Sequence, residues 1–217
     1  MKETILNIAA VVATLAAVAA AAVRLREPHR TPVLAEEQQP KTISDWQQYT
    51  TEGARFGPPN PVVTVVEFLD FQCPFCRTAA STLRELRRLH PRDVAVVYRH
   101  FPQQDVSLDA AVAAECGNRS GAFQQIHDHF FEQPDSLGVK PWTRFAWEAA
   151  IQDTVRFAAC LKDSTARFVV RRDFQAAQEL DVFGTPTLLV NDQLFTGSPS
   201  LKYLDHHVKK VKKAMNE

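Results

Sequence analysis

The residues best suited to chemistry are two cysteines at a close spacing, in the segment Cys73-Pro74-Phe75-Cys76. A pair at this spacing can form and break a disulfide bond, or it can supply half of a zinc site. Zinc needs two further ligands, and the chain has no second cysteine pair of this kind. His127 and His129 stand two apart on an expected helix, so they face different directions. The spacing therefore favours a redox pair without a metal.

The residues around the pair predict a strand before it and a helix after it. Val62 to Leu69 is strongly apolar and rich in β-branched residues, which is typical of a strand buried on both faces. From Cys73 to about His90 the apolar residues recur at helical spacing, and Pro91 ends the helix. Cys73 should therefore lie at a helix N-terminus, where free N–H groups and the helix dipole favour a thiolate.

This placement gives the two sulfurs different roles. Cys73 would be the exposed nucleophile, and Cys76, one turn further along, would be the buried resolving thiol. Pro74 is tolerated in the first turn, where its missing N–H has no helical partner to lose. Phe75 brings no charge to the sulfur. A purely structural disulfide is the alternative, but closing so short a loop restricts the unfolded chain little.

The rest of the chain predicts a mixed α/β domain. A second strand, Val94 to Tyr98, completes a βαβ unit with parallel strands. A hairpin turning at Asn191-Asp192 and a final helix from Ser200 to about Met215 close the domain. The expected helices between strand and hairpin are Ser107 to Asn118, Ala122 to Glu132, Lys140 to Ile151, Thr154 to Lys162 and Ser164 to Leu180, and the hairpin strands are Thr187 to Val190 and Leu194 to Thr196.

The run from Val65 to Cys76 (VVEFLDFQCPFC) resembles the active-site segment of the DsbA-like branch of the thioredoxin superfamily. Gly184-Thr185-Pro186-Thr187 is similar to that family's cis-proline loop, and the helical insertion at about 107–180 is also typical of it. The resemblance covers the chain from about Val62 onward. It implies an α/β thioredoxin fold (βαβ…ββα) with a helical insertion, here preceded by an N-terminal apolar helix.

The resemblance also implies a role for each residue of the motifs. Cys73 would be the nucleophile and Cys76 the resolving cysteine. Pro186 would follow a cis peptide bond, and Thr185 would offer its backbone to an extended substrate. Glu67 matches the family's buried acid, which would relay a proton to and from Cys76; the alternative is a partly solvated glutamate, although an acid in an apolar strand is costly to bury. The implied substrate-binding residues are Pro74, Phe75, Thr185 and Pro186.

Two further cysteines, Cys116 and Cys160, lie on expected helices of the insertion. Some DsbA-like proteins have an additional structural disulfide in this region, and the resemblance implies a Cys116–Cys160 bond. Such a bond would close a loop of about 45 residues and contribute roughly 2–4 kcal/mol to stability. The alternative is a pair of free cysteines that pack as small apolar side chains.

The N-terminus predicts a membrane or export segment. Ile5 to Val23 is almost wholly apolar and long enough for one membrane crossing, so residues 1–23 are expected to be a signal anchor or a cleaved signal peptide. Arginines after the segment would favour a cytoplasmic C-terminal side, which conflicts with an oxidising compartment. Residues 24–60 are expected to be a linker followed by an irregular segment, and 61–217 the DsbA-like domain.

The amino-acid composition does not favour a protein that binds nucleic acid. The 217 residues include 25 Lys or Arg and 25 Asp or Glu, so no charge excess favours a nucleic-acid partner. The basic run at 209–213 is expected to be a solvated helix end.

Together these patterns predict an extracytoplasmic protein thiol-disulfide oxidoreductase without a cofactor. It would introduce disulfides into secreted or envelope proteins in the periplasm or at the outer face of the cell membrane. Its expected partners are reduced or misoxidised protein substrates and a DsbB- or VKOR-like membrane reoxidase. A disulfide reductase or isomerase is the enzymatic alternative. A non-catalytic thioredoxin-fold binding module or chaperone is the alternative of another class, and a glutathione transferase is disfavoured by the two cysteines of the pair.

Overall fold

The computed structural model describes residues 39–215. The expected signal anchor or signal peptide at 1–23 lies outside the described residues, as does most of the linker. Within 39–215 the structure contains no helix with the length and apolar character needed to cross a membrane.

The centre of the domain is a six-stranded sheet with the order β1-β6-β5-β3-β4-β2. β3 and β4 pair in parallel, and every other neighbouring pair is antiparallel. The crossover from β3 to β4 is the expected βαβ unit. The strands are β1 (Lys41–Thr42), β2 (Ala54–Phe56), β3 (Val63–Leu69), β4 (Val94–His100), β5 (Thr187–Val190) and β6 (Gln193–Thr196).

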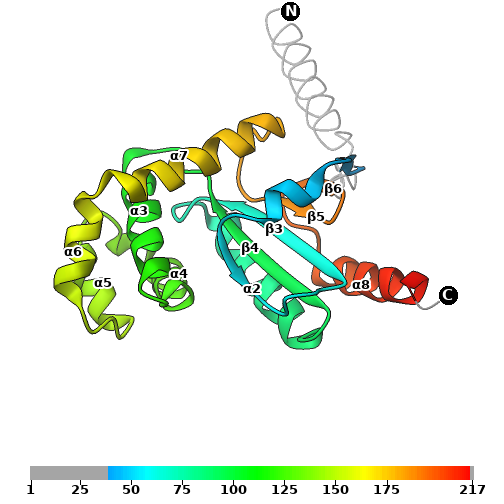
Figure 1. Ribbon diagram of the computed structural model, residues 1–217, viewed down its shortest axis with the longest axis horizontal. Coiled ribbons are helices and arrows are strands. Elements are labelled where there is room, and N and C mark those ends of the chain that lie inside the picture. The colour runs from blue at the N-terminus through cyan, green and yellow to red at the C-terminus, as the bar shows by residue number, and fades with distance from the viewer. Residues whose placement is uncertain (1–38, 216–217) are drawn as a thin grey trace, which may run out of the picture. The chain divides into compact units, whose positions relative to one another are not determined.

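The helices fall into two groups. Figure 1 shows α3 to α6 gathered beside the sheet and α7 running from that group to the sheet. The second half of α7 packs on one face of the sheet, whereas α2 and α8 lie on the other. This order confirms the expected βαβ…ββα arrangement with a helical insertion. The α-helices are α2 (Pro74–Leu89), α3 (Asp105–Arg119), α4 (Phe123–Glu132), α5 (Trp142–Glu148), α6 (Thr154–Lys162), α7 (Ser164–Glu179) and α8 (Leu201–Met215), and the 3-10 helices are η1 (Trp46–Thr50) and η2 (Pro134–Ser136).

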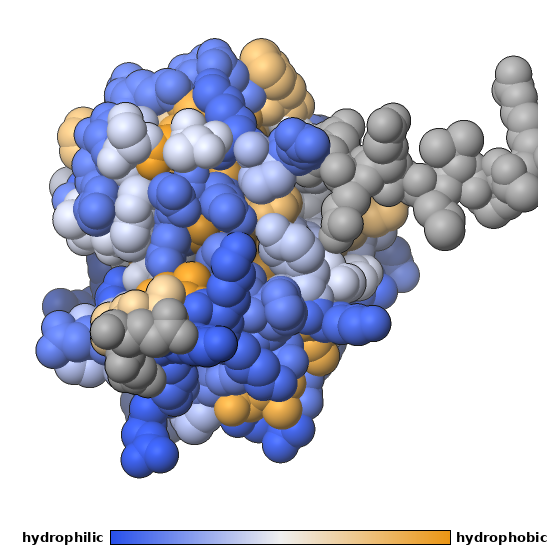
Figure 2. Space-filling view, turned by 90° about the vertical axis from the view of Figure 1, so that its right-hand side faces the viewer, coloured by the Kyte–Doolittle hydropathy of each residue, from blue (hydrophilic) through white to orange (hydrophobic). Residues whose placement is uncertain are grey.

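Both faces of the sheet are covered, which explains the continuous apolar run of β3. Val63 and Val65 point into a core shared with α2, α8 and the insertion. Val66 and Phe68 point into a second core against α7 and η1. Alternate residues of one strand thus enter different cores, as the two-residue period of a strand requires. The face turned to the viewer in Figure 2 is covered mainly by hydrophilic side chains, with apolar ones in small separate groups.

A buried ion pair fixes the last helix of the insertion to the sheet. Arg99 Nε on β4 donates to Asp173 Oδ1 on α7 at 2.9 Å, and both side chains are almost fully buried. The His100 backbone N–H donates to the other Asp173 oxygen at 3.1 Å. Removing one partner of such a pair strands a buried charge. The pair therefore holds α7 in a defined position, and the loop that precedes β5 follows α7 directly.

The structure departs from the expected elements in two places. The segment expected to be irregular before residue 61 contains β1 and β2, which extend the sheet at its two edges. The expected helix from Lys140 to Ile151 is shorter, because Pro141 caps its start and Ala150 adopts a positive φ of 59° just after its end.

Candidate active site

Helix α2 begins at the cysteine pair. Cys73 is the N-cap residue, and Pro74 occupies the first helical turn. The Cys73 backbone N–H donates to the Asp70 carbonyl oxygen at 3.1 Å, which closes a tight turn at the end of β3. The Asp70 side chain accepts a second bond from the Gln72 N–H at 2.7 Å. Strand, turn and helix thus place the Cys73 sulfur at the helix N-terminus, as the sequence predicts.

The two cysteines of the pair differ in exposure. Cys73 is partly exposed, whereas Cys76 is fully buried in the core under α2, and both thiols are free. Phe75 between them is 71% exposed. The structure therefore presents one sulfur to other molecules and keeps its neighbour in the interior.

The loop before β5 meets the pair from the other end of the domain. The peptide bond between Thr185 and Pro186 is cis. The Cys73 thiol donates a hydrogen bond to the Thr185 carbonyl oxygen at 3.2 Å. Thr187 stabilises the loop, because its hydroxyl donates to the Gly184 carbonyl oxygen at 2.8 Å. The two motifs singled out in the sequence are thereby brought into direct contact.

Glu67 lies on β3 with no solvent exposure, and neither carboxyl oxygen has a hydrogen-bond partner among the described residues. Burial raises the pKa of Glu67 to about 8, because the charged form loses its hydration in the core. Near neutral pH the carboxyl therefore carries a proton. It is a buried acid that can give or take a proton within the physiological range.

The thiol of Cys76 shares the environment of Glu67. Burial raises the pKa of Cys76 well above its ordinary value, and the charge of Glu67 raises it further. Hydrogen bonds from the Asp70 backbone and the Thr185 side chain act in the opposite direction. Cys76 therefore needs a proton acceptor close by before it can attack another sulfur.

Cys116 and Cys160 lie elsewhere, in the insertion. Their sulfur atoms are 2.04 Å apart and form a disulfide that joins α3 to α6. Cys116 is 1% exposed and packs in the main core, and Cys160 lies at its edge. The structure thus separates the four cysteines into one bonded pair and one free pair.

Sequence reasoning missed the carboxyl group that connects the active-site turn to the loop after β4. One Asp70 oxygen accepts from Gln72, and the other accepts from the Gln103 backbone N–H at 2.9 Å. The Ser107 hydroxyl adds a bond to the Gln72 side chain at 2.9 Å. Aspartate two residues before a backbone donor is a turn signal that could have been noted, but its second partner is distant in sequence.

Sequence reasoning also missed a group of buried aromatic and histidine side chains behind the pair. Tyr98 pairs with Glu67 across the two parallel strands, and its ring centroid lies 4.7 Å from that of His127. Burial lowers the pKa of His127 and of His100, so both are neutral near pH 7. His127 Nδ1 lies 3.0 Å from an oxygen of Asp128 at the surface. Histidines at apolar positions of a strand and a helix were the available signal.

The chain matches known proteins over most of its length. The family model described as Thioredoxin matches residues 50–210. Among curated relatives, the antiporter NhaA 3 of Salinispora tropica is 36% identical over 151 residues, which is 68% of this chain but only 23% of the antiporter. The NhaA 1 antiporter of Mycolicibacterium gilvum is 31% identical over 146 residues, and this chain spans 24% of it. The chain thus spans about a quarter of the curated relatives it matches.

Solved structures with the same fold include one named as a thioredoxin-like oxidoreductase and two named as DsbA proteins. A thioredoxin-like oxidoreductase from Silicibacter pomeroyi superposes with a TM-score of 0.63 at 28% identity, covering 73% of this chain and 91% of that one. DsbA2 of Pseudomonas aeruginosa gives a TM-score of 0.64 at 25% identity, covering 76% and 96%. The alpha-DsbA1 of Wolbachia pipientis gives 0.66 at 19% identity, covering 76% and 94%, which shows a common fold.

Proposed function

The chain belongs to the thioredoxin family, as a DsbA-like member of that superfamily, and we propose that it is an extracytoplasmic oxidoreductase that introduces disulfides into secreted or envelope proteins. One observation carries the proposal. The partly exposed Cys73 sulfur caps α2 and lies 3.2 Å from the Thr185 carbonyl oxygen, with Cys76 buried one turn deeper. This is an accessible sulfur beside a backbone group that can bind an extended chain.

The proposed reaction starts from the disulfide form of the active pair. A substrate thiolate attacks the Cys73 sulfur, a mixed disulfide forms, and Cys76 leaves with the bonding electrons. The second thiolate of the substrate then attacks the substrate sulfur that is bonded to Cys73. A disulfide forms within the substrate, and Cys73 leaves as a thiolate. The substrate has lost two electrons and gained a disulfide, and the enzyme holds two reduced cysteines.

Glu67 supplies the proton in this scheme. Because the pKa of Glu67 is raised to about 8, its carboxyl is protonated near neutral pH and can protonate Cys76 as that sulfur leaves. In the reverse step the carboxylate accepts the proton from Cys76. The high pKa of the Cys76 thiol makes such a partner necessary, since hydroxide from solvent has no path to a fully buried sulfur.

The backbone of Thr185 provides the substrate contact. In the free, reduced form its carbonyl oxygen accepts a hydrogen bond from the Cys73 thiol. A Cys73 thiolate or a mixed disulfide has no proton to donate, so the carbonyl becomes available to an N–H of the substrate. Pro74, Phe75 and Pro186 border the same position. In the disulfide form that meets the substrate, Cys73 likewise has no proton to donate, so the Thr185 carbonyl oxygen is available to an extended chain.

The compartment and the partner are part of the proposal. A disulfide such as Cys116–Cys160 persists in oxidising compartments, and the N-terminal apolar segment is of a kind that exports or anchors a chain. The reduced enzyme would pass its two electrons to a DsbB- or VKOR-like membrane reoxidase. Its substrates are reduced or misoxidised proteins.

A redox titration of the protein against glutathione tests the direction of the reaction. We expect the active pair to be reduced in preference to ordinary structural disulfides, with an equilibrium constant typical of an oxidant. A potential near that of cytosolic reductants would assign a reductase or isomerase role instead. Exchange that is absent altogether would favour a thioredoxin-fold binding module or chaperone.

A further inference from the structure

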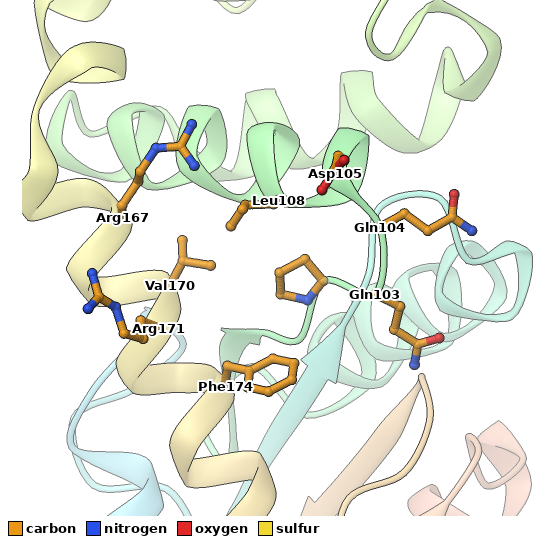
Figure 3. A pocket seen from close by; sticks show the side chains of 9 residues that line it. Gln103, Gln104, Asp105, Leu108, Arg167, Val170, Arg171 and Phe174 are labelled. Atoms are coloured by element: carbon orange, nitrogen blue, oxygen red, sulfur yellow. The ribbon is translucent and has the colours of Figure 1, made fainter.

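A pocket of about 430 Å³ lies between α3, α7 and the loop that joins β4 to α3 (Figure 3). Its volume is in the range of sites that bind small molecules or a few side chains. None of the proposed catalytic residues lines it. The lining residues are Pro102, Gln103, Gln104, Asp105, Leu108, Arg167, Val170, Arg171 and Phe174.

The floor of the pocket is apolar and fixed in place. Leu108 from α3 faces Val170 from α7 (Figure 3), and Pro102 adds to the apolar lining. Phe174 closes the lower side, and its ring stacks on Phe101 with the centroids 4.7 Å apart. An apolar side chain that enters this space is removed from water without any need to reshape the floor.

The α7 wall of the pocket is cationic. Arg167 and Arg171 are four residues apart on this helix. Figure 3 shows the Arg167 side chain turned toward α3 and the Arg171 side chain at the rim, pointing away from the pocket floor. Arg167 is engaged with Asp109 of α3 at 3.0 Å. The Arg171 guanidinium forms no ion pair or hydrogen bond with any residue in the described range 39–215. The opposite wall is formed by Gln103, Gln104 and Asp105, and the Asp105 carboxylate is the one acidic group among the lining residues.

Both walls continue into the segments that flank the reacting sulfur. The Gln103 backbone N–H donates to Asp70, the residue whose carbonyl oxygen accepts from the Cys73 N–H. On the other side, α7 ends at Glu179 and leads into the loop with the cis peptide bond before Pro186. A chain that lies across Thr185 can therefore extend toward the pocket on the same edge of the sheet.

We propose that this pocket binds a second part of the polypeptide substrate, a segment near the reacting cysteine in which a large apolar side chain stands beside an acidic one. The apolar side chain fills the floor, and the carboxylate pairs with Arg171. This inference rests on the proposed function and adds a substrate preference to it. A carboxylate of the substrate would give the Arg171 guanidinium a charged partner, which it lacks among the described residues.

Peptide dithiols test the preference. Three peptides contain the same two cysteines and differ only in a tail that is attached through a flexible linker. The first tail has an acidic residue beside a large apolar one, the second a basic residue beside the apolar one, and the third an acidic residue beside serine. They are called the acidic–apolar, basic–apolar and acidic–serine tails. Each tail is placed before and after the cysteines, because either chain direction can reach the pocket. Single-turnover oxidation by the full chain is followed by acid trapping and mass spectrometry. We expect the acidic–apolar tail to react about threefold to tenfold faster than the others in one of the two placements.

Two charge reversals locate the effect. Arg171→Glu should remove the advantage of the acidic–apolar tail and transfer it to the basic–apolar tail. Arg156→Glu is the matched control, because Arg156 is an exposed arginine on α6 that does not line the pocket. Raising the salt concentration should reduce the advantage in the wild type.

The outcomes separate the two proposals. Equal rates for all tails, or the same change in Arg171→Glu and Arg156→Glu, overturn the pocket assignment while a tail-free dithiol is still oxidised. If the wild type fails to oxidise the tail-free dithiol, both the oxidase function and the substrate pocket are overturned. A preference that moves to the basic–apolar tail only in Arg171→Glu supports the pocket.

Discussion

The two cysteine pairs of this chain contain the same atoms and have opposite properties. Cys73 and Cys76 lie in the first turn of one helix, and their thiols are free. Cys116 and Cys160 are 44 residues apart and join α3 to α6 through a disulfide. In the proposed function the first pair exchanges partners with other molecules, whereas the second pair links two helices.

The difference comes from access and from loop length. An attacking thiolate can reach the partly exposed Cys73, but Cys116 is 1% exposed and packed among the alanines of α3. Closing a 44-residue loop restricts the unfolded chain far more than closing the short loop of the active pair. Cysteine chemistry in this fold is therefore decided by the position of the sulfur and not by the residue type.

The largest expected effect is the loss of exchange in Cys73→Ser. A serine hydroxyl cannot form the mixed disulfide, so oxidation of a small dithiol should fall to the uncatalysed rate. The measurement is the rate of dithiothreitol oxidation with a stoichiometric amount of oxidised enzyme. Cys116→Ser with Cys160→Ser is the control, and it should keep nearly the full rate. A residual catalysed rate in Cys73→Ser would show that another sulfur does the chemistry.

The second effect concerns stability, where the Cys116–Cys160 disulfide should matter more than the active pair. Replacing Cys116 and Cys160 together by alanine should lower the free energy of unfolding by about 2–4 kcal/mol, since the unfolded chain regains its freedom. Urea denaturation under oxidising conditions measures the change. The matched double replacement of Cys73 and Cys76 should cost less, because that loop is short. An equal cost for both replacements would contradict the comparison.

The elements around the active pair could be predicted because their signals are local. The apolar run of β3, the helical spacing after Cys73 and the Gly-Thr-Pro motif all lie within short windows. The helix Thr154–Lys162 has the bounds expected from the sequence. Glu67 could be singled out because an acid within an apolar strand requires an explanation, and the structure shows it fully buried.

What could not be predicted depends on distant partners. β1 consists of Lys41 and Thr42, and nothing in two polar, exposed residues indicates a strand until β6 pairs with them. Asp70 resembles an ordinary turn residue, and only the fold brings the Gln103 N–H to its second oxygen. The pocket beside α7 joins residues from about 102 to 174 in the sequence, so no local pattern describes it.

The third effect concerns Glu67, the buried acid that acts on Cys76 of the active pair. The pKa of Glu67 is about 8 in the folded protein against an ordinary value of 4.5. Between these pH values the folded state holds a proton that the unfolded state has released, so stability falls as the pH rises, by at most about 1.4 kcal/mol per pH unit. From pH 5.5 to 7.5 this contribution is roughly 2–3 kcal/mol.

Glu67→Gln removes that titration. The stability of the variant relative to the wild type should therefore increase as the pH is raised from 5.5 to 7.5, which urea midpoints at several pH values will measure. Glu132→Gln, which removes an exposed carboxyl at the end of α4, serves as the control for the loss of a carboxyl. Parallel curves for wild type and Glu67→Gln would contradict a buried, protonated carboxyl.

The smallest effect separates the side chain of Thr185 from its backbone. The side-chain hydroxyl lowers the pKa of Cys76, whereas the carbonyl oxygen accepts from Cys73. Thr185→Val removes the hydroxyl and keeps the shape and the backbone, so the pKa of Cys76 should rise slightly. The attack of Cys76 on a mixed disulfide between Cys73 and glutathione should then be about twofold to tenfold slower, because less of Cys76 is ionised.

Thr185→Ser keeps the hydroxyl and should retain the wild-type rate of that attack. If serine and valine slow the reaction equally, the loss comes from the missing or altered packing of the side chain and not from the hydrogen bond. The Cys116–Cys160 disulfide should be unaffected by either change, since Thr185 contacts only the active pair among the cysteines of the described residues. If the Thr185 hydroxyl changes the pKa of Cys76 and leaves the Cys116–Cys160 disulfide unaffected, the position of each sulfur determines its chemistry.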